Sequence, residues 1–142
     1  MSMGIMGYAR EFKRLEEIRN KLIVELTEWI ESVNVDIKEE AGGADAIRAV
    51  QHLDNVIKLK FLDFTLCIKF DICASKNIGF IKWFSEDPEY LDRPKAKLIF
   101  KHKFNHDGIN SHAYENRFLY FRDTLSLFCE KVDQVEFDEK AP

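Results

Sequence analysis

The period of the hydrophobic pattern changes near residue 55, and this change constrains the fold more than any other feature of the chain. Over residues 5–33, apolar residues recur mostly at steps of three or four, which is typical of an amphipathic helix. From residue 55 onward, apolar and polar residues alternate, which is typical of half-buried strands. Steps of three and four return over about residues 113–135. This order predicts an α+β two-layer sandwich, in which a long N-terminal helix and a C-terminal helix pack on one face of an antiparallel meander of about four strands.

The first helix is predicted to be unusually long for a chain of this size. At 1.5 Å per residue, a helix of about 29 residues measures about 43 Å, more than the width of a small domain. We therefore expect part of it to extend beyond the sheet or to contact another subunit. Its apolar stripe comprises Tyr8, Phe12, Leu15, Ile18, Leu22, Leu26, Trp29 and Val33.

Residues 35–54 are predicted to connect the first helix to the strands. The pair Gly42-Gly43 disfavours a continuous helix at this point. Asp45 is a good N-cap for a short helix that would include Ala46 through Val50. We therefore expect a connector with one short helix.

The alternating region predicts several strands joined by tight turns. Its phase slips by one residue near Leu62-Asp63, which requires a bulge or a turn there. The segments "IGFIKWF" and "KAKLIFKHKF" predict two further strands, with "SKNIG" as the turn before the first of them. Asp107-Gly108 predicts a turn into the last helix, although a strand at 117–121 followed by a helix capped by Asp123 is an alternative. The acidic tail, residues 137–142, is expected to fray.

Composition is that of an ordinary soluble protein. The chain has 142 residues, of which 46% are hydrophobic and 32% charged, so we expect one domain spanning residues 1–142. No apolar run reaches the ~20 residues that cross a membrane. Three cysteines without CxxC spacing argue against a disulfide framework and favour a reducing, cytoplasmic environment.

Charge is unevenly distributed along the chain, although the net charge is only −4. Residues 55–106 contain 10 basic and 6 acidic side chains, whereas both flanking regions are acidic. Such asymmetry bears on partners and self-association rather than on the fold.

The predicted strands gather lysines on the sheet face opposite the phenylalanine-rich layer. We expect Ile81, Trp83 and Ile99 to form an apolar island on that face. Lys82 falls out of phase with this set, and we expect its stem to be buried near the strand end with its charge in water. The lysines expected to frame the island are Lys58, Lys60, Lys69, Lys97, Lys101 and Lys103.

Three interpretations of this face follow. It could bind an acidic protein surface, from a partner or from a second copy of the chain. It could stack single-stranded nucleic acid or RNA on Trp83, with lysines on the phosphates. It could also be a solvated face whose lysines guard the sheet against aggregation. The overall acidity argues against nucleic acid, because such domains are usually basic.

The stretch "KHKFNHDGINSH" raises the question of a metal site. His102 and His106 lie about 13 Å apart on a strand, too far to share an ion, whereas His106, Asp107 and His112 flank a turn and could converge. Zinc needs three or four ligands, and the cysteines show no ligand spacing. We predict instead that His102 fills a slot between Phe100 and Phe104 and has a hydrogen-bond partner. His106 and His112 are predicted to be solvated.

The sequence contains no motif that fixes a reaction or a cofactor. There is no GxSxG, phosphate-binding glycine loop or HExxH. Cys129 is expected to be structural, and the acidic cluster over residues 86–92 to be solvated. We predict a non-catalytic binding module, an adaptor, escort or inhibitor that forms a homodimer or binds a protein through the lysine-framed face or the first helix. An enzyme whose site is assembled from scattered residues is a third hypothesis, after nucleic-acid binding.

Overall fold

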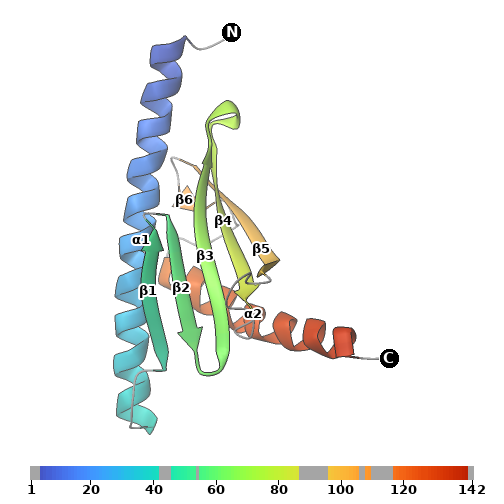
Figure 1. The fold of residues 1–142 in the computed structure, drawn as a ribbon. Helices are drawn as coiled ribbons and strands as arrows, with labels where there is room; N and C mark the ends of the chain where they lie inside the picture. Colours follow the sequence, from blue (N-terminus) through green and yellow to red (C-terminus); the bar gives the residue numbers. More distant parts are fainter. Residues whose placement is uncertain are drawn as a thin grey trace.

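A computed structural model describes residues 4–41, 46–53, 55–86, 96–105, 108–109 and 117–140. It confirms the predicted α+β fold, with a long N-terminal helix, an antiparallel meander and a C-terminal helix packed against the sheet (Figure 1). The helices are α1 (Ile5–Ala41) and α2 (Arg117–Lys140).

The strands follow one another across the sheet in chain order, and every neighbouring pair is antiparallel. Two strands were not expected: the first, and the short one that follows the fifth. A short 3-10 helix, η1 (Ala74–Lys76), joins the third and fourth strands. The strands are β1 (Ile47–Leu53), β2 (Val56–Phe61), β3 (Phe64–Cys73), β4 (Ile78–Glu86), β5 (Ala96–Asn105) and β6 (Gly108–Ile109).

The short helix predicted within residues 35–54 is wrong. Helix α1 continues to Ala41, and residues 47–53 form the edge strand β1. Two sets of contacts hold residues 47–53 as a strand. Strand β2 pairs with β1 through a two-residue connection, since Leu53 lies opposite Val56. The buried side chain of Asn34 donates to the carbonyl of Ile47 at 2.8 Å and accepts from its N–H at 2.9 Å. These contacts override a weak local preference.

The two tight turns predicted within the meander are confirmed. Phe61 pairs with Phe64, so Leu62 and Asp63 form a two-residue turn, and Leu62 has a φ of 56°. This turn produces the phase slip seen in the sequence. After η1, Asn77 adopts a left-handed conformation with a φ of 52°, which asparagine tolerates well.

The connection from β5 to α2 differs from the expectation. Gly108 pairs with Asn105, so the chain turns back along β5 as β6 before the helix. Helix α2 includes residues 117–121, so the alternative strand there is wrong. The helix also continues through Lys140, beyond the point at which fraying was expected.

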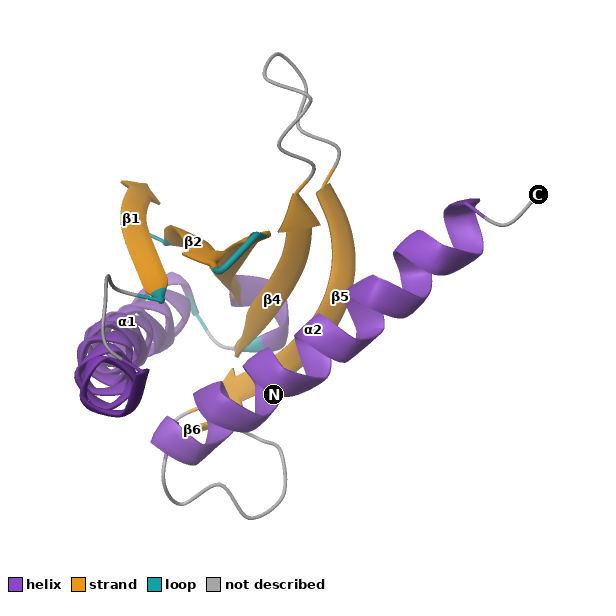
Figure 2. Cartoon of the chain, turned by 90° about the horizontal axis from the view of Figure 1, so that it is seen from below, coloured by secondary structure: helices purple, strands orange, loops and turns teal. Residues whose placement is uncertain are grey.

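Both helices lie on the same side of the sheet, and the core lies between them and it (Figure 2). The helices also meet each other, since the rings of Trp29 and Phe121 are 5.8 Å apart. The predicted stripe of α2 is confirmed at its centre: Phe121, Leu125, Phe128 and Val132 are all buried.

Helix α1 is longer than the sheet it covers. Its 37 residues span about 55 Å, whereas the ten residues of β3 span about 33 Å. The N-terminal turns extend past β1 (Figure 1), and the first fully buried residue is Leu15. The predicted overhang is thus present.

Candidate functional site

Strand register sorts the side chains of the sheet into a helix-covered face and an open face. On the open face, Lys82 of β4 pairs with Lys69 of β3 on one side and with Lys101 of β5 on the other. Three lysines therefore form a row across three adjacent strands. Like charges directly opposite each other destabilise a sheet, so this row is unfavourable unless anions neutralise it.

Asp71 supplies part of that neutralisation from within the sheet. Its carboxylate contacts the ammonium of Lys82 at 2.8 Å and that of Lys69 at 3.7 Å. Asp71 is 23% exposed and Lys82 27%, so this pair is partly shielded from water. Lys101 lies at the other end of the row and is exposed. One carboxylate thus serves two lysines, and the row keeps an excess of positive charge.

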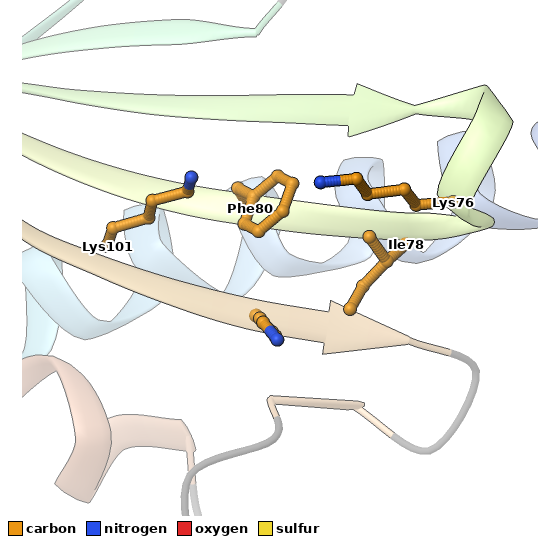
Figure 3. A pocket seen from close by; sticks show the side chains of 5 residues that line it. Lys76, Ile78, Phe80 and Lys101 are labelled. Atoms are coloured by element: carbon orange, nitrogen blue, oxygen red, sulfur yellow. The ribbon is translucent and has the colours of Figure 1, made fainter.

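A groove lies beside this row, towards η1. It has a volume of about 530 Å³ and is lined by Lys76, Ile78, Phe80, Lys101 and Lys103. The ammonium of Lys101 lies 4.3 Å from the centre of the Phe80 ring. Lys76 and Lys101 reach towards Phe80 from opposite sides (Figure 3). The groove therefore has an apolar floor and a cationic rim.

The other predicted lysines divide between the faces. Lys103 pairs with Phe80, and Lys58 and Lys60 pair with Cys67 and Thr65, all in phase with the open face. Lys97 is not in phase with them, because it pairs with Ser85, which is in phase with Trp83.

The predicted apolar island on the open face is wrong. Ile81 and Trp83 are fully buried on the helix-covered face. Ile99 is partly buried and packs against the core, because a bulge places it between the residues that pair with Trp83 and Phe84. The phase error is explained by Lys82: its charge marks the open face, so its neighbours Ile81 and Trp83 must point inward.

Trp83 and His102 belong instead to a polar contact beneath α2. The Trp83 indole N–H donates to the Tyr120 hydroxyl at 3.1 Å, and that hydroxyl lies 2.7 Å from His102 Nδ1. This confirms the predicted partner for His102, whose ring also stacks on Phe100. Burial lowers the pKa of His102 below its ordinary 6.5, which favours the neutral ring. Trp83 and Tyr120 are at most 1% exposed, so their hydrogen bond lies within the core.

Cys73 ends β3 on the open face, opposite Ile78. A hydrogen bond with the Ser75 hydroxyl, 3.4 Å from its sulfur, lowers the pKa of this thiol. Cys67 is buried and Cys129 partly buried, and none of the three cysteines forms a disulfide.

The N-terminal end of α1 is a second candidate surface. Ile5 is 87% exposed and Met6 75%, and Tyr8 and Phe12 continue the apolar stripe with partial exposure. A cluster of exposed apolar side chains on one end of a helix is a feature of contact surfaces.

Several sequence predictions lie outside the described residues. They concern His106, Asp107 and His112, and the acidic loop after Glu86. Within the part of the chain that the structure describes, no three His, Cys, Asp or Glu side chains are grouped to hold a metal ion. Neither described helix is long and apolar enough to cross a membrane.

Sequence reasoning missed five groove and row residues: Asp71, Lys76, Ile78, Phe80 and Lys82. The phase of Lys82 could have placed Ile78 and Phe80 on the open face with it, whereas Lys76 enters from η1 and Asp71 acts through cross-strand register. No family model, curated protein or solved structure matches this chain.

Proposed function

We propose that the protein is a non-catalytic binding module whose open sheet face binds an acidic segment of a partner protein. The row of Lys69, Lys82 and Lys101 carries this proposal. Repulsion within the row costs stability in the free protein, and carboxylates placed over the row would relieve it.

The expected interaction is fast and sensitive to salt. Ammonium groups on exposed side chains attract an acidic segment over about a Debye length, which is ~10 Å at 0.1 M salt. Each exposed ion pair contributes only ~0.2–1 kcal/mol, so useful affinity requires several of them together. The open face offers such an array, from Lys58 and Lys60 on β2 to Lys103 on β5.

Three observations favour an acidic protein over single-stranded nucleic acid. Trp83, the aromatic residue expected to stack a base, is sealed beneath α2. Phe80, an aromatic residue of the open face, has the Lys101 ammonium over its ring, where a base would otherwise stack. A net charge of −4 also opposes association with a polyanion elsewhere on the molecule.

Fluorescence anisotropy with a labelled glutamate-rich peptide tests the proposal. The variant Lys101→Glu with Lys103→Glu should bind about tenfold more weakly than the wild type, which corresponds to ~1.4 kcal/mol. The matched control is Lys13→Glu with Lys21→Glu, which makes the same change in net charge at exposed positions on α1. This control should bind nearly as the wild type does.

A single-stranded oligonucleotide in the same assay separates the two polyanions. Tighter binding of the oligonucleotide than of the peptide, lost in the Lys101 and Lys103 variant, would favour nucleic acid and contradict the proposal. Equal losses in both charge-reversal variants would show that net charge, rather than the open face, determines binding.

Self-association through the N-terminal end of α1 is a second candidate function, favoured by the exposure of Ile5 and Met6. If a second copy covers them, light scattering after size exclusion should give a dimer mass for the wild type. Ile5→Glu with Met6→Glu should give a monomer, whereas Val24→Glu, at another exposed apolar position on α1, should not. A wild-type monomer at high micromolar concentration would rule this out.

A further inference from the structure

The groove at the η1 end of the open face differs from the rest of that face. Elsewhere on that face the lysines project from strands alone, but here Lys76 of η1 joins the β5 lysines Lys101 and Lys103 around Ile78 and Phe80. Both apolar side chains are partly exposed within the groove. Its volume of about 530 Å³ is within the ~300–1,000 Å³ range of ligand pockets.

The positions of the charges and of the apolar surface in the groove define which ligand would be complementary to it. Lys76 and Lys101 approach Phe80 from opposite sides (Figure 3), so positive charge brackets the apolar floor. Lys101 already covers part of the Phe80 ring, so an anion bound to that ammonium would lie beside the apolar floor. An occupant should thus present acidic groups on either side of an apolar group.

We propose that this groove selects, within an acidic partner segment, an apolar side chain flanked by acidic ones. This inference rests on the proposed function and adds sequence selectivity to it. In an extended peptide, residues i, i+2 and i+4 point the same way at about 7 Å intervals. The fitting pattern is therefore acidic, any residue, apolar, any residue, acidic, with the apolar side chain on Ile78 and Phe80 and the carboxylates near Lys76 and Lys101.

Two peptides of equal length and charge test the selectivity. One carries leucine at the centre of the pattern and the other carries serine. By anisotropy at low salt, the wild type should bind the leucine peptide about tenfold more tightly, because the corresponding ~1.4 kcal/mol is slightly less than full burial of such a side chain contributes. Both peptides retain the carboxylates, so charge alone predicts equal binding.

Groove variants then locate the effect. Phe80→Ala should reduce the leucine preference to about twofold, while binding of the serine peptide stays unchanged. Ile78→Ser gives an independent second variant, and circular dichroism confirms that each is folded. Lys58→Gln with Lys60→Gln, on the same face but outside the groove, should keep the full preference.

The outcomes distinguish the selectivity of the groove from the proposed binding of acidic segments to the open face. If the wild type binds both peptides equally, the groove is not selective, yet the open face still binds acidic segments. If the preference survives both Phe80→Ala and Ile78→Ser, it arises elsewhere and the inference fails. If neither peptide binds at low salt, both the inference and the proposed function fail.

Discussion

The two faces of the sheet are built from the same strands, and side chains one residue apart have opposite environments. On β4, Trp83 is fully buried and hydrogen-bonded beneath α2, whereas its neighbour Lys82 lies in a row of lysines on the open face. On the covered face, the Trp83 indole and His102 both find a polar partner in Tyr120. The open face leaves positive charge in excess, since one carboxylate contacts two of the three lysines in the row.

The two faces should differ most in the free energy of unfolding that is lost when an aromatic side chain is removed from each. Trp83→Ala should lower the free energy of unfolding by ~3–5 kcal/mol, because it empties a buried site and leaves the Tyr120 hydroxyl without its indole donor. Phe80→Ala, on the same strand but on the open face, should cost less than ~2 kcal/mol. Urea denaturation measures both, and equal losses would contradict the assignment of the faces.

Substitution of Gly79, on the covered face, should have an intermediate effect on stability. Phe104 pairs with Gly79 and its ring occupies the place where a Cβ would be. Gly79→Ala should therefore cost ~1–3 kcal/mol by overpacking. In a Phe104→Leu background the same substitution should cost less, because the smaller side chain leaves room. A double-mutant cycle checks this, and strict additivity would show that Phe104 is not the obstacle.

A smaller effect is expected from pH, because His102 is only half buried. Its folded pKa is lowered, so the unfolded chain binds more protons as pH falls past the ordinary 6.5. The stability that depends on a neutral His102 is thus fully present above pH 6.5 and is lost as pH falls from there through the folded pKa. Chemical denaturation of the wild type and of His102→Gln across this range should show a shallower slope in the variant; identical slopes would assign the dependence to other groups.

The smallest effect on stability is expected from the open face. Lys101→Gln should change the free energy of unfolding by less than ~0.5 kcal/mol, and could raise it slightly by relieving repulsion with Lys82. Urea denaturation at low salt is the measurement. A loss above ~1 kcal/mol would mean that the row holds the sheet together and is not a surface kept for a ligand.

Hydrophobic period predicted the helices and the central strands because it reflects burial directly. It failed at β1, where pairing with β2 and the side chain of Asn34 outweigh local preference. It also failed at Ile99, since a bulge cannot be located from alternation alone.

The candidate site was only half predictable for a related reason. Alternation placed the lysines on β2, β3 and β5 correctly, apart from Lys97, but Lys82 was treated as an exception to it, which placed Trp83 on the wrong face. The groove depends on Lys76 meeting Phe80 and Lys101, and this meeting arises from the β3–β4 and β4–β5 registers.

The most direct test of the open face as a binding surface is to map a bound acidic peptide by NMR. Titration of the leucine-containing peptide into isotope-labelled protein should shift the backbone amides of β3, β4 and β5 around Lys69, Phe80 and Lys101. The amides of α2 and of the α1 N-terminal end should stay in place. Shifts confined to the α1 end, or none at peptide concentrations in the millimolar range, would contradict the account.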